Sequence, residues 1–541
     1  MSYLELAIAM TAVVGLTCAA DAAGQGASVW VASPWEFVLR NAKPGPSRSI
    51  RLSAARNEYE PARVVITAGA AALHEVNVAA SALAGPGKRQ IAASNLRLYR
   101  EHYLNIDTPS PRSMASPGWY PDPLLPFVDP DTGRPAHEAQ YRAAPFDVAP
   151  GSSQGIWVDV YVPRNTPAGE YKGAVTVTCS GKTLARVPLS LTVFDFTLPQ
   201  TFALRSNFGS LENRLATGLG MDAASPEFRR VEDMYIDMLL AHRLQPSTLG
   251  RIWPDWTPEK GIDDSHSGAR LRKMVRERHI NSLMVPFRYW GDPDKCTGYL
   301  RAMQHYLSRR GLLDLSYIYM LDEPNTAEQY ETVRQQGKLI HQAAPGIKRL
   351  CTEQTLTQDP AWGDLNGAVD IWCPLWGLYD GKTARERQAL GEEIWSYTAL
   401  CQADEKNPFW EIDFPPIVYR SPFWVTWHYD IKGMLYWSSI WWKDAASVWQ
   451  RPLFTDQYWG EGILLYPGGP AGIDGPVPSI RLKLIREGME DFEYMALAAK
   501  AVGKEKVDQL VSSLARSFTD WDRDPNAYMR GRAELARLLQ R

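Results

Sequence analysis

The sequence predicts a multidomain fold in which an N-terminal antiparallel β-sandwich, residues 24–199, precedes a (β/α)8 TIM barrel with C-terminal helices, residues 200–541. Two observations lead to this prediction. Up to about Pro199 apolar residues recur at every second position, which is typical of half-buried strands. After Pro199 short apolar runs alternate with segments of helical periodicity, the pattern of β/α units around a parallel sheet.

Residues 1–22 have the character of a secretory signal peptide. Residues 6–20 are apolar, and residues 20–22 (Ala-Asp-Ala) fit the small-x-small cleavage pattern. The match is atypical, because the preceding region has no Lys or Arg and carries Glu5. The sequence therefore predicts an exported protein, periplasmic, secreted or at the cell surface. It leaves open whether Cys18 carries a lipid anchor. No other stretch is long and apolar enough to span a bilayer.

The strands of the sandwich are predicted from strict alternation. Ile156, Val158, Val160 and Val162 alternate with polar and aromatic residues, and two further runs, at 175–179 and 187–193, repeat the pattern. A turn at residues 165–169 (Asn-Thr-Pro-Ala-Gly) separates two of these runs. The segment 108–142 is rich in Pro, Asp and Gly and too long for a plain connector, so we expect a loop that reaches the neighbouring domain.

Eight strands are predicted for the barrel, with helices between most pairs. One of them, near Gln245 to Leu249, has the weakest pattern. The other seven are expected at residues 205–209, 282–287, 315–321, 347–353, 369–374, 396–402 and 434–441. Counted in this way, the adjacent acids Asp322 and Glu323 close the fourth strand.

Composition narrows the function classes. The 541 residues carry a formal net charge of −3 with interspersed signs, which gives no electrostatic footprint for nucleic acid. The chain contains 20 Trp and 24 Tyr, whose apolar ring faces and polar edges suit sugar rings, although most aromatic residues belong to cores. No Cys/His cluster has metal-ligand spacing, so neither a metal nor another cofactor is expected. The oligomeric state is left open.

The acid pair Asp322-Glu323 is the strongest candidate for chemistry. Pro324 ends the strand, and Thr326 with Gln329 three residues later has the spacing of a helix-initiating capping box. A pair of acids at the carboxyl end of a barrel strand would lie on the catalytic rim, whereas an isolated Asp-Glu pair is more often a salt-bridged loop. Candidate substrate-binding residues at other strand ends are Asn207, Arg288, Tyr289, Glu353, Trp376, Tyr379, Trp437 and Trp441, with Glu411 and Asp413 as further acids. Their convergence on one rim favours an enzyme that acts on a sugar.

The last long helix is predicted to begin after Ser479, a plausible N-cap residue. Its many charged residues are interpreted as structural, because Arg481, Arg486, Glu490 and Asp491 have helical spacing for ion pairs.

Several segments together resemble glycoside hydrolase family 123, the β-N-acetylgalactosaminidase family. They are residues 54–61 (AARNEYEP), 322–324 (DEP), 465–468 (LYPG) and 478–494. The resemblance implies a β-sandwich followed by a (β/α)8 barrel. It also implies substrate-assisted catalysis, with Glu323 as the general acid and base and Asp322 orienting the 2-acetamido group. An aromatic-walled acetamide pocket would draw on Trp376, Tyr379, Trp437 and Trp441.

The leading hypothesis is an exported, retaining β-N-acetylhexosaminidase that prefers N-acetylgalactosamine and acts on a glycan or glycoconjugate. One alternative is a retaining or inverting glycosidase acting on a non-acetylated sugar, with Glu323 as acid and Glu353 or Glu411 as the second carboxylate. Another is a carbohydrate-binding protein that has lost its activity.

Overall fold

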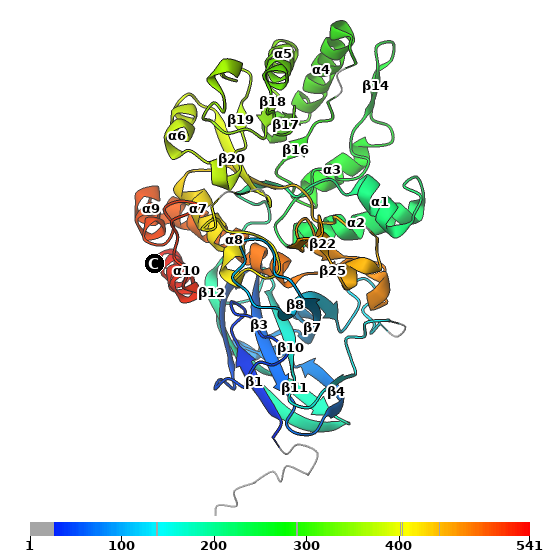
Figure 1. The fold of residues 1–541 in the computed structure, drawn as a ribbon, viewed down its shortest axis with the longest axis vertical. Coiled ribbons are helices and arrows are strands. Elements are labelled where there is room, and N and C mark those ends of the chain that lie inside the picture. The colour runs from blue at the N-terminus through cyan, green and yellow to red at the C-terminus, as the bar shows by residue number, and fades with distance from the viewer. Residues whose placement is uncertain are drawn as a thin grey trace, which may run out of the picture.

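The computed structural model describes residues 26–136, 139–287, 290–400, 402, 404–442 and 444–540. The predicted signal peptide lies outside these residues, as do Arg288 and Tyr289, two of the predicted substrate-binding residues. The N-terminal sandwich and the parallel sheet occupy opposite ends of the molecule, and the C-terminal helices lie between them (Figure 1).

The predicted β-sandwich is present as two packed sheets. The first has the order β1 (Ser28–Ala32), β3 (Glu58–Thr67), β10 (Ser153–Val162), β7 (Leu96–Ile106) and β8 (Gly118–Pro126). The second has the order β2 (Ile50–Arg56), β12 (Lys182–Thr197), β11 (Gly169–Cys179), β4 (Leu73–Ala80) and β9 (Phe146–Val148), with β5 (Leu83–Ala84) and β6 (Gln90–Ile91) beside β11. The sandwich departs from an antiparallel fold at one place, because β2 and β12 pair in parallel.

Two sandwich predictions need correction. Residues 118–126 are the edge strand β8, not loop; prolines are tolerated there because an edge strand needs only one set of ladder hydrogen bonds. The alternation predicts half-buried strands, yet Trp157 and Asp159, which lie between the apolar residues of β10, are fully buried. The C-terminal part of the chain covers this face, so alternation of polarity in β10 does not mean exposure.

In its described residues the second domain contains a curled parallel sheet of seven strands, so the predicted closed barrel of eight is not confirmed. The order is β13 (Arg205–Asn207), β21 (Gly433–Tyr436), β20 (Glu393–Thr398), β19 (Ile371–Trp372), β18 (Lys348–Cys351), β17 (Ser316–Tyr319) and β16 (Leu283–Met284). All six neighbouring pairs are parallel. The helices around it are α1 (Glu212–Leu219), α2 (Pro226–Ala241), α3 (Gly268–Arg276), α4 (Pro293–Ser308), α5 (Ala327–Ala343), α6 (Gly381–Ala389) and α7 (Ser421–His428).

The predicted strand at 245–249 is wrong, and its sequence explains why. Pro246 has no N–H to donate to a sheet ladder. The segment nevertheless fills the gap between β13 and β16. Phe208 N–H donates to the carbonyl of Gln245 (2.8 Å), and Ser247 N–H donates to the carbonyl of Gly209 (3.0 Å). On the other side the Gln245 amide group bonds the backbone of Asn281 and Ser282 in place of a ladder.

Short hairpins and helices complete the chain. The hairpins are β14 (Asp255–Thr257) with β15 (Gly261–Asp263), β22 (Leu453–Phe454) with β23 (Tyr458–Trp459), and β24 (Leu465–Tyr466) with β25 (Val477–Pro478). The C-terminal helices are α8 (Ile480–Val502), α9 (Lys504–Ser512) and α10 (Pro525–Leu539). The short 3-10 helices are η2 (Pro86–Lys88), η3 (Ala93–Asn95), η4 (Leu313–Leu315), η5 (Pro360–Trp362), η6 (Trp376–Leu378), η7 (Pro416–Tyr419), η8 (Ser447–Trp449) and η9 (Gly469–Ala471).

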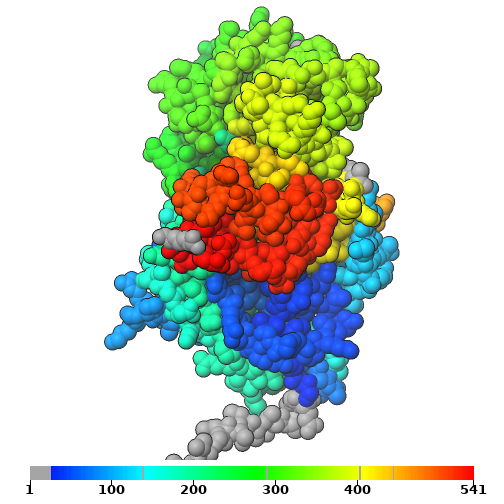
Figure 2. Space-filling view, turned by 90° about the vertical axis from the view of Figure 1, so that its left-hand side faces the viewer, coloured from blue at the N-terminus to red at the C-terminus, as the bar shows by residue number. Residues whose placement is uncertain are grey.

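Helix α8 connects the two domains through buried charge pairs. It begins at the predicted cap, where the Ser479 hydroxyl accepts a hydrogen bond from Leu482 N–H. Most of its charges pair outside the helix: Arg481 with Asp122 of β8 (2.9 Å), and Lys483 and Arg486 with Asp159 of β10 (2.9 and 2.7 Å). Of the ion pairs expected within α8, Arg486 with Glu490 is present (3.9 Å). Asp491 instead pairs with Arg420 of the second domain (2.6 Å). The surface of the C-terminal helices, orange to red, lies between the blue sandwich and the green and yellow sheet domain (Figure 2).

No helix in the described ranges has the length and apolarity needed to cross a bilayer.

Candidate active site

The acid pair Asp322-Glu323 immediately follows β17, at the carboxyl end of the parallel sheet. Pro324 ends the strand, and α5 begins after Thr326, whose hydroxyl accepts a hydrogen bond from Gln329 N–H (3.2 Å). The Gln329 side chain bonds Asn325 N–H (2.7 Å), one residue earlier than in an ideal capping box. One face of α5 and its C-terminal cap, formed by Tyr330, Val333, Ile340 and Ala344, is buried. The strand-to-helix transition therefore presents both acids at the rim, as predicted.

Asp322 is held by two hydroxyl groups from neighbouring strands. Tyr319 of β17 and Thr352, just after β18, both donate to Oδ1 of Asp322, the latter at 2.8 Å. Thr352 Oγ1 also accepts a hydrogen bond from the backbone N–H of Glu323 (2.9 Å). In the described part of the chain, both side-chain bonds to Asp322 end on the same oxygen. This geometry leaves Oδ2 available to a substrate.

Glu323 points to a different part of the rim. Its φ of 42° lies in the left-handed region, which is uncommon for a residue other than glycine and is often found at functional sites. The Tyr397 hydroxyl, from β20, donates a hydrogen bond to Glu323 Oε1. Both acids of the pair are exposed to solvent. Adjacent residues thus present carboxylates with separate partners and separate directions.

Glu353 lies behind the pair and is buried. It accepts hydrogen bonds from the Tyr330 hydroxyl (3.1 Å) and from the Gln358 amide (3.1 and 3.2 Å), so both of its oxygens are engaged. Burial raises the pKa of Glu353 to about 7, the hydrogen bonds oppose that rise, and the charge of Glu323 adds to it. Glu353 therefore carries a perturbed pKa close to the acid pair.

Three other predicted residues lie at the same end of the sheet. Asn207, at the end of β13, is buried and donates to the Tyr317 hydroxyl (2.9 Å). Trp437 and Trp441, after β21, are half-buried and pack edge to face with ring centroids 4.8 Å apart. Trp437 Nε1 donates to Glu461. These two indole rings line a hollow of about 420 Å³, on the side of the rim across from the acid pair.

The structure places Trp376 and Tyr379 away from the rim, contrary to the predicted acetamide pocket. Trp376 is buried, stacks on Phe518 with centroids 5.2 Å apart, and donates its Nε1–H to Ser396 (3.1 Å). Because Ser396 precedes Tyr397 on β20 and alternate residues point to opposite faces, this contact lies on the outer side of the sheet. Tyr379 packs in the same outer cluster against Tyr429, with centroids 4.5 Å apart.

Glu411 is the other acid considered as a second carboxylate. It is buried beside Glu461, whose carboxylate accepts a hydrogen bond from the Tyr436 hydroxyl (3.1 Å). Burial and then the charge of Glu461 raise the pKa of Glu411 well above its ordinary value. Asp413 accepts two hydrogen bonds from Ser110 (2.7 Å each), so the predicted reach of segment 108–142 into the neighbouring domain is confirmed. Asp413 is therefore a contact between the domains, and Glu411 is a fully buried acid beside Glu461.

Sequence reasoning missed three residues that hold the acid pair: Tyr319, Thr352 and Tyr397. Each was inside or next to a predicted strand, and the period of two assigns Tyr317, Tyr319 and Tyr397 to the interior of the curled sheet. The signal that could have revealed them was hydroxyl-bearing side chains on the inward positions near strand ends. Which acid each hydroxyl group binds, by contrast, depends on the order of the strands in the sheet, and the sequence alone does not give that order.

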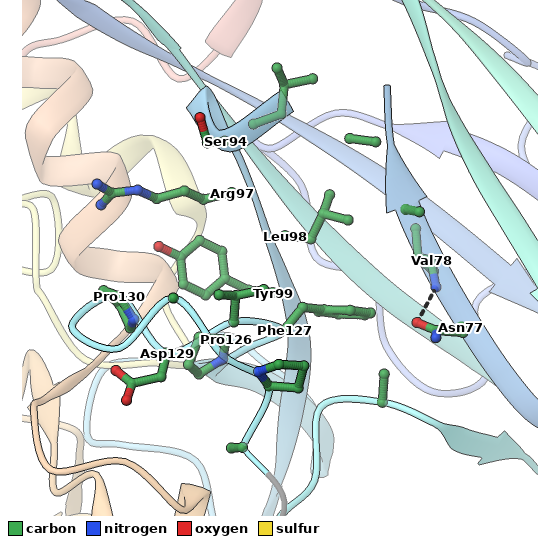
Figure 3. A pocket seen from close by; sticks show the side chains of 18 of the residues that line it. Asn77, Val78, Ser94, Arg97, Leu98, Tyr99, Pro126, Phe127, Asp129 and Pro130 are labelled. Atoms are coloured by element: carbon green, nitrogen blue, oxygen red, sulfur yellow. Dashed lines mark hydrogen bonds between the residues drawn. The ribbon is translucent and has the colours of Figure 1, made fainter. Parts of the chain in front are cut away.

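The sandwich holds a separate cavity of about 950 Å³ (Figure 3), and neither Asp322 nor Glu323 is among its lining residues. Its walls come from β4, β7 and the segment after β8, with Val78, Leu98 and Phe127 among the apolar side chains. Arg97 and Tyr99 lie on the side away from Val78, as alternation on β7 requires (Figure 3).

The residues described contain no group of three or more His, Cys, Asp or Glu side chains that could hold a metal ion.

Comparisons with known proteins agree with this architecture. The protein-family model described as glycoside hydrolase 123, catalytic domain, matches residues 294–498, a range that contains Asp322 and Glu323. The model described as glycoside hydrolase 123 N-terminal domain matches residues 39–179, within the sandwich. Together the two matches span more than half of the chain. Among curated proteins, none matches.

Solved structures with a similar fold include a family 123 glycoside hydrolase from Clostridium perfringens that hydrolyses glycolipid glycans. It aligns with a TM-score of 0.67 at 15% identity, over 95% of this chain and 97% of that chain. A family 39 glycoside hydrolase from Bacteroides cellulosilyticus has a TM-score of 0.32 at 8% identity, covering 84% of this chain and 82% of its own, which is too distant to support a conclusion. The two family matches and the shared fold show that this chain belongs to glycoside hydrolase family 123 and is a glycosidase.

Proposed function

We propose that the chain is a retaining β-N-acetylhexosaminidase, with a preference for N-acetylgalactosamine, that uses the substrate's own acetamido group as the nucleophile. The observation that carries this proposal is the pair Asp322-Glu323, whose adjacent carboxylates are fixed by different hydroxyl groups. In ordinary retaining glycosidases two carboxyls face each other about 5–5.5 Å apart across the bond, while substrate-assisted enzymes are exceptions. Asp322 and Glu323 are adjacent residues at the end of one strand, an arrangement that fits the substrate-assisted mechanism better than the ordinary one.

In the first step Glu323 donates its proton to the glycosidic oxygen, and the leaving alcohol departs. The carbonyl oxygen of the 2-acetamido group attacks the anomeric carbon and closes an oxazolinium ring. Asp322 accepts the acetamide N–H through its available oxygen, which orients the group and stabilises the positive charge that develops. In the second step Glu323 takes a proton from water, and that water opens the oxazolinium from the opposite face. The product keeps the β configuration.

The alternative of a second protein carboxylate has less support. Both oxygens of Glu353 are already bonded by Tyr330 and Gln358. Glu411 is fully buried beside Glu461. A nucleophile needs a carboxylate oxygen that is accessible to the anomeric carbon, whereas both oxygens of Glu353 are bonded and Glu411 is closed off from solvent.

The test is hydrolysis of aryl β-N-acetylgalactosaminide, β-N-acetylglucosaminide and β-galactoside by wild type, Asp322→Asn and Glu323→Gln. We expect activity on the N-acetylated substrates only, highest on the galacto epimer. Loss of the general acid is worth about 10²–10⁴-fold, so Glu323→Gln is expected to lose that much on poor leaving groups. Asp322→Asn should lose activity with every leaving group, and a thiazoline mimic of the oxazolinium should inhibit. Turnover of the plain galactoside, or an Asp322→Asn enzyme close to wild type, would refute the mechanism.

Two further parts of the proposal concern the natural substrate of the enzyme and its export. The natural substrate is proposed to be a glycolipid or other glycoconjugate ending in β-linked N-acetylgalactosamine, in keeping with the activity of the Clostridium perfringens structure. Export is proposed from residues 1–22. Cell fractionation with N-terminal sequencing tests this: a mature chain beginning after Ala22 supports cleavage, and a full-length cytoplasmic chain refutes it.

A further inference from the structure

A hollow of about 420 Å³ lies on the catalytic face of the sheet and has no assigned role. It is formed by α1, which follows β13, and by the segment that follows β21, with Asn213, Arg214, Trp437, Ser438 and Trp441 in its lining. Both segments leave the carboxyl ends of neighbouring parallel strands, so the hollow opens on the same face as Asp322 and Glu323. Three strands, β18, β19 and β20, separate β21 from β17, so it lies across the rim from the acid pair.

Arg214 is the unusual group in this hollow. Its guanidinium carbon lies 3.2 Å from the ring centroid of Trp441. Among the residues the structure describes, no carboxylate pairs with Arg214, whereas Arg270 on α3 pairs with Asp233 and Arg230 on α2 pairs with Asp474. Partial burial lowers the pKa of Arg214, and no acid opposes that effect. A guanidinium that is half-buried without a counter-charge is a site that attracts an anion.

Stacking on Trp441 prepares Arg214 for such a ligand. A guanidinium stacked through its face keeps its N–H groups at its edge, where they match the two oxygens of a carboxylate or sulfate. The Trp437 ring beside it is fixed by the bond from Nε1 to Glu461, so it provides a rigid apolar wall. Apolar ring faces pack well against the C–H faces of a sugar ring, and Asn213 and Ser438 add polar groups at the border.

We propose that this hollow is a subsite for a sugar that carries an anionic substituent, with the sugar ring against Trp437 and the anion paired with Arg214. The substituent is a carboxylate or a sulfate ester, since both present the same pair of oxygens. Because the subsite lies across the rim from the acid pair, a glycan must be branched or longer than one sugar to occupy both places at once. The inference rests on membership of the glycosidase family, and on the proposed N-acetylhexosaminidase activity only for the choice of assay substrate.

Binding is tested directly by saturation-transfer NMR with the full chain. The probes are glucuronic acid and galactose 6-sulfate, compared with glucose and galactose. We expect transfer to at least one anionic probe, roughly tenfold stronger binding than its neutral partner, and loss of that difference in Arg214→Gln. A preference for glucuronic acid identifies the carboxylate, and a preference for the sulfated sugar identifies the ester. Equal binding of charged and neutral probes overturns the proposal.

Kinetics provides the second arm. Matched oligosaccharides that end in β-N-acetylgalactosamine, with and without the anionic sugar, are compared by their ratio of kcat/KM. Arg214→Gln is expected to lower this ratio roughly tenfold, and Arg214→Lys, which keeps the charge but not the paired N–H edge, to lower it less. The control is Arg276→Gln, an exposed arginine at the end of α3, which should leave the ratio unchanged. An unchanged ratio in a folded Arg214→Gln protein overturns the proposal. If no N-acetylhexosaminidase activity is found, the proposed function fails and the NMR arm still decides the subsite.

Discussion

The Tyr397 hydroxyl donates a hydrogen bond to Glu323 Oε1 across the mouth of the curled sheet. Tyr397 belongs to β20 and Glu323 follows β17, with β18 and β19 between them in the sheet. The bond leaves Oε2 of Glu323 to carry the proton in the proposed mechanism. Tyr397 therefore positions the carboxylate that the proposed mechanism uses as its general acid.

Removing this hydroxyl should impair proton donation more than substrate binding. A hydrogen bond to a charged group is worth about 1.5–3 kcal/mol, so Tyr397→Phe is expected to lower kcat by about 10–100-fold with little change in KM. The defect should be largest for aryl substrates with poor leaving groups, since these depend on the acid. Steady-state kinetics across a leaving-group series measures both effects.

A uniform defect across that series would argue against a role for Tyr397 in proton donation. Tyr319→Phe provides the matched comparison, because Tyr319 bonds Asp322 rather than Glu323. Its defect should not depend on the leaving group. Both variants remove one hydroxyl from the inner face of the same sheet, so they carry similar structural risk.

Glu353 separates the proposed mechanism from its main alternative. As a nucleophile or second base it would be essential, and Glu353→Gln would abolish turnover. As a buried group bonded by Tyr330 and Gln358, it supports the loop behind the acid pair. We therefore expect Glu353→Gln to retain activity within roughly tenfold of wild type. Complete loss in a folded variant, with activity on an unacetylated substrate in the wild type, would favour the alternative.

The same residue predicts a pH effect on stability. Its pKa is about 7 in the folded chain against an ordinary value of 4.5, so the folded state binds the extra proton between these values. The stabilisation is full below about pH 4.5 and is lost as the pH rises towards 7. Glu353→Gln should remove this part of the pH dependence, so the difference between its melting temperature and that of wild type should shift across this window. Glu386→Gln, an exposed glutamate on α6, serves as the control and should show no such shift.

The sequence predicted the order of the two domains and the location of the acid pair because both depend on local patterns. Periodicity located seven of the eight expected strands to within a few residues, and Pro324 with Thr326 marked the strand-to-helix transition. The eighth failed because Pro246 removes a backbone donor, and the Gln245 side chain replaces the ladder. The side-chain bonds that replace the ladder involve Asn281 and Ser282, which lie 36 and 37 positions away along the chain, so no local pattern reveals them.

The wider site was less predictable for the same reason. Trp376 and Trp437 both follow strands in the sequence, yet Trp376 packs outside the sheet against Phe518 while Trp437 lines the rim. The difference is set by where the chain turns after β19 and β21 and by the C-terminal segment that covers the outer face. The charges of α8 show the same limit. Their helical spacing predicted pairs within the helix, but burial against the sandwich gave Arg481 and Arg486 partners more than 300 residues away.

Gly433 on β21 has no side chain, and this leaves room for the large side chain of Trp395 in the interior of the sheet. A Cβ at this position would lie 2.2 Å from Cδ2 of Trp395, the neighbouring inward residue on β20. Trp395 is fully buried and packs against Tyr317 with centroids 5.2 Å apart, so it has little room to move. Gly433→Ala should therefore cost about 1–3 kcal/mol through overpacking. Denaturant unfolding measures the loss, with Gly469→Ala, where a Cβ meets nothing within 4 Å, as the control. Equal stability of the two variants would contradict the packing argument.

Arg532 of α10 touches carboxylates from both domains. It lies 2.6 Å from Glu60 of β3 and 3.3 Å from Glu487 of α8, and also pairs with Glu58. Removing a partner from a buried cluster leaves uncompensated charge, so Arg532→Met should lower the free energy of unfolding by about 3–5 kcal/mol.

The matched control for Arg532→Met is Arg530→Met, which removes an exposed arginine paired with Asp524 on the same helix and should change little. Thermal melting compares the two. The loss in Arg532→Met should also be smaller at acidic pH, because protonation of the carboxylates removes the charge left behind. A melting temperature equal to that of Arg530→Met would mean that the carboxylates around Arg532 are already neutral in the folded chain. The junction between the sandwich and the C-terminal helices would then depend on apolar packing and hydrogen bonds instead of charge pairing.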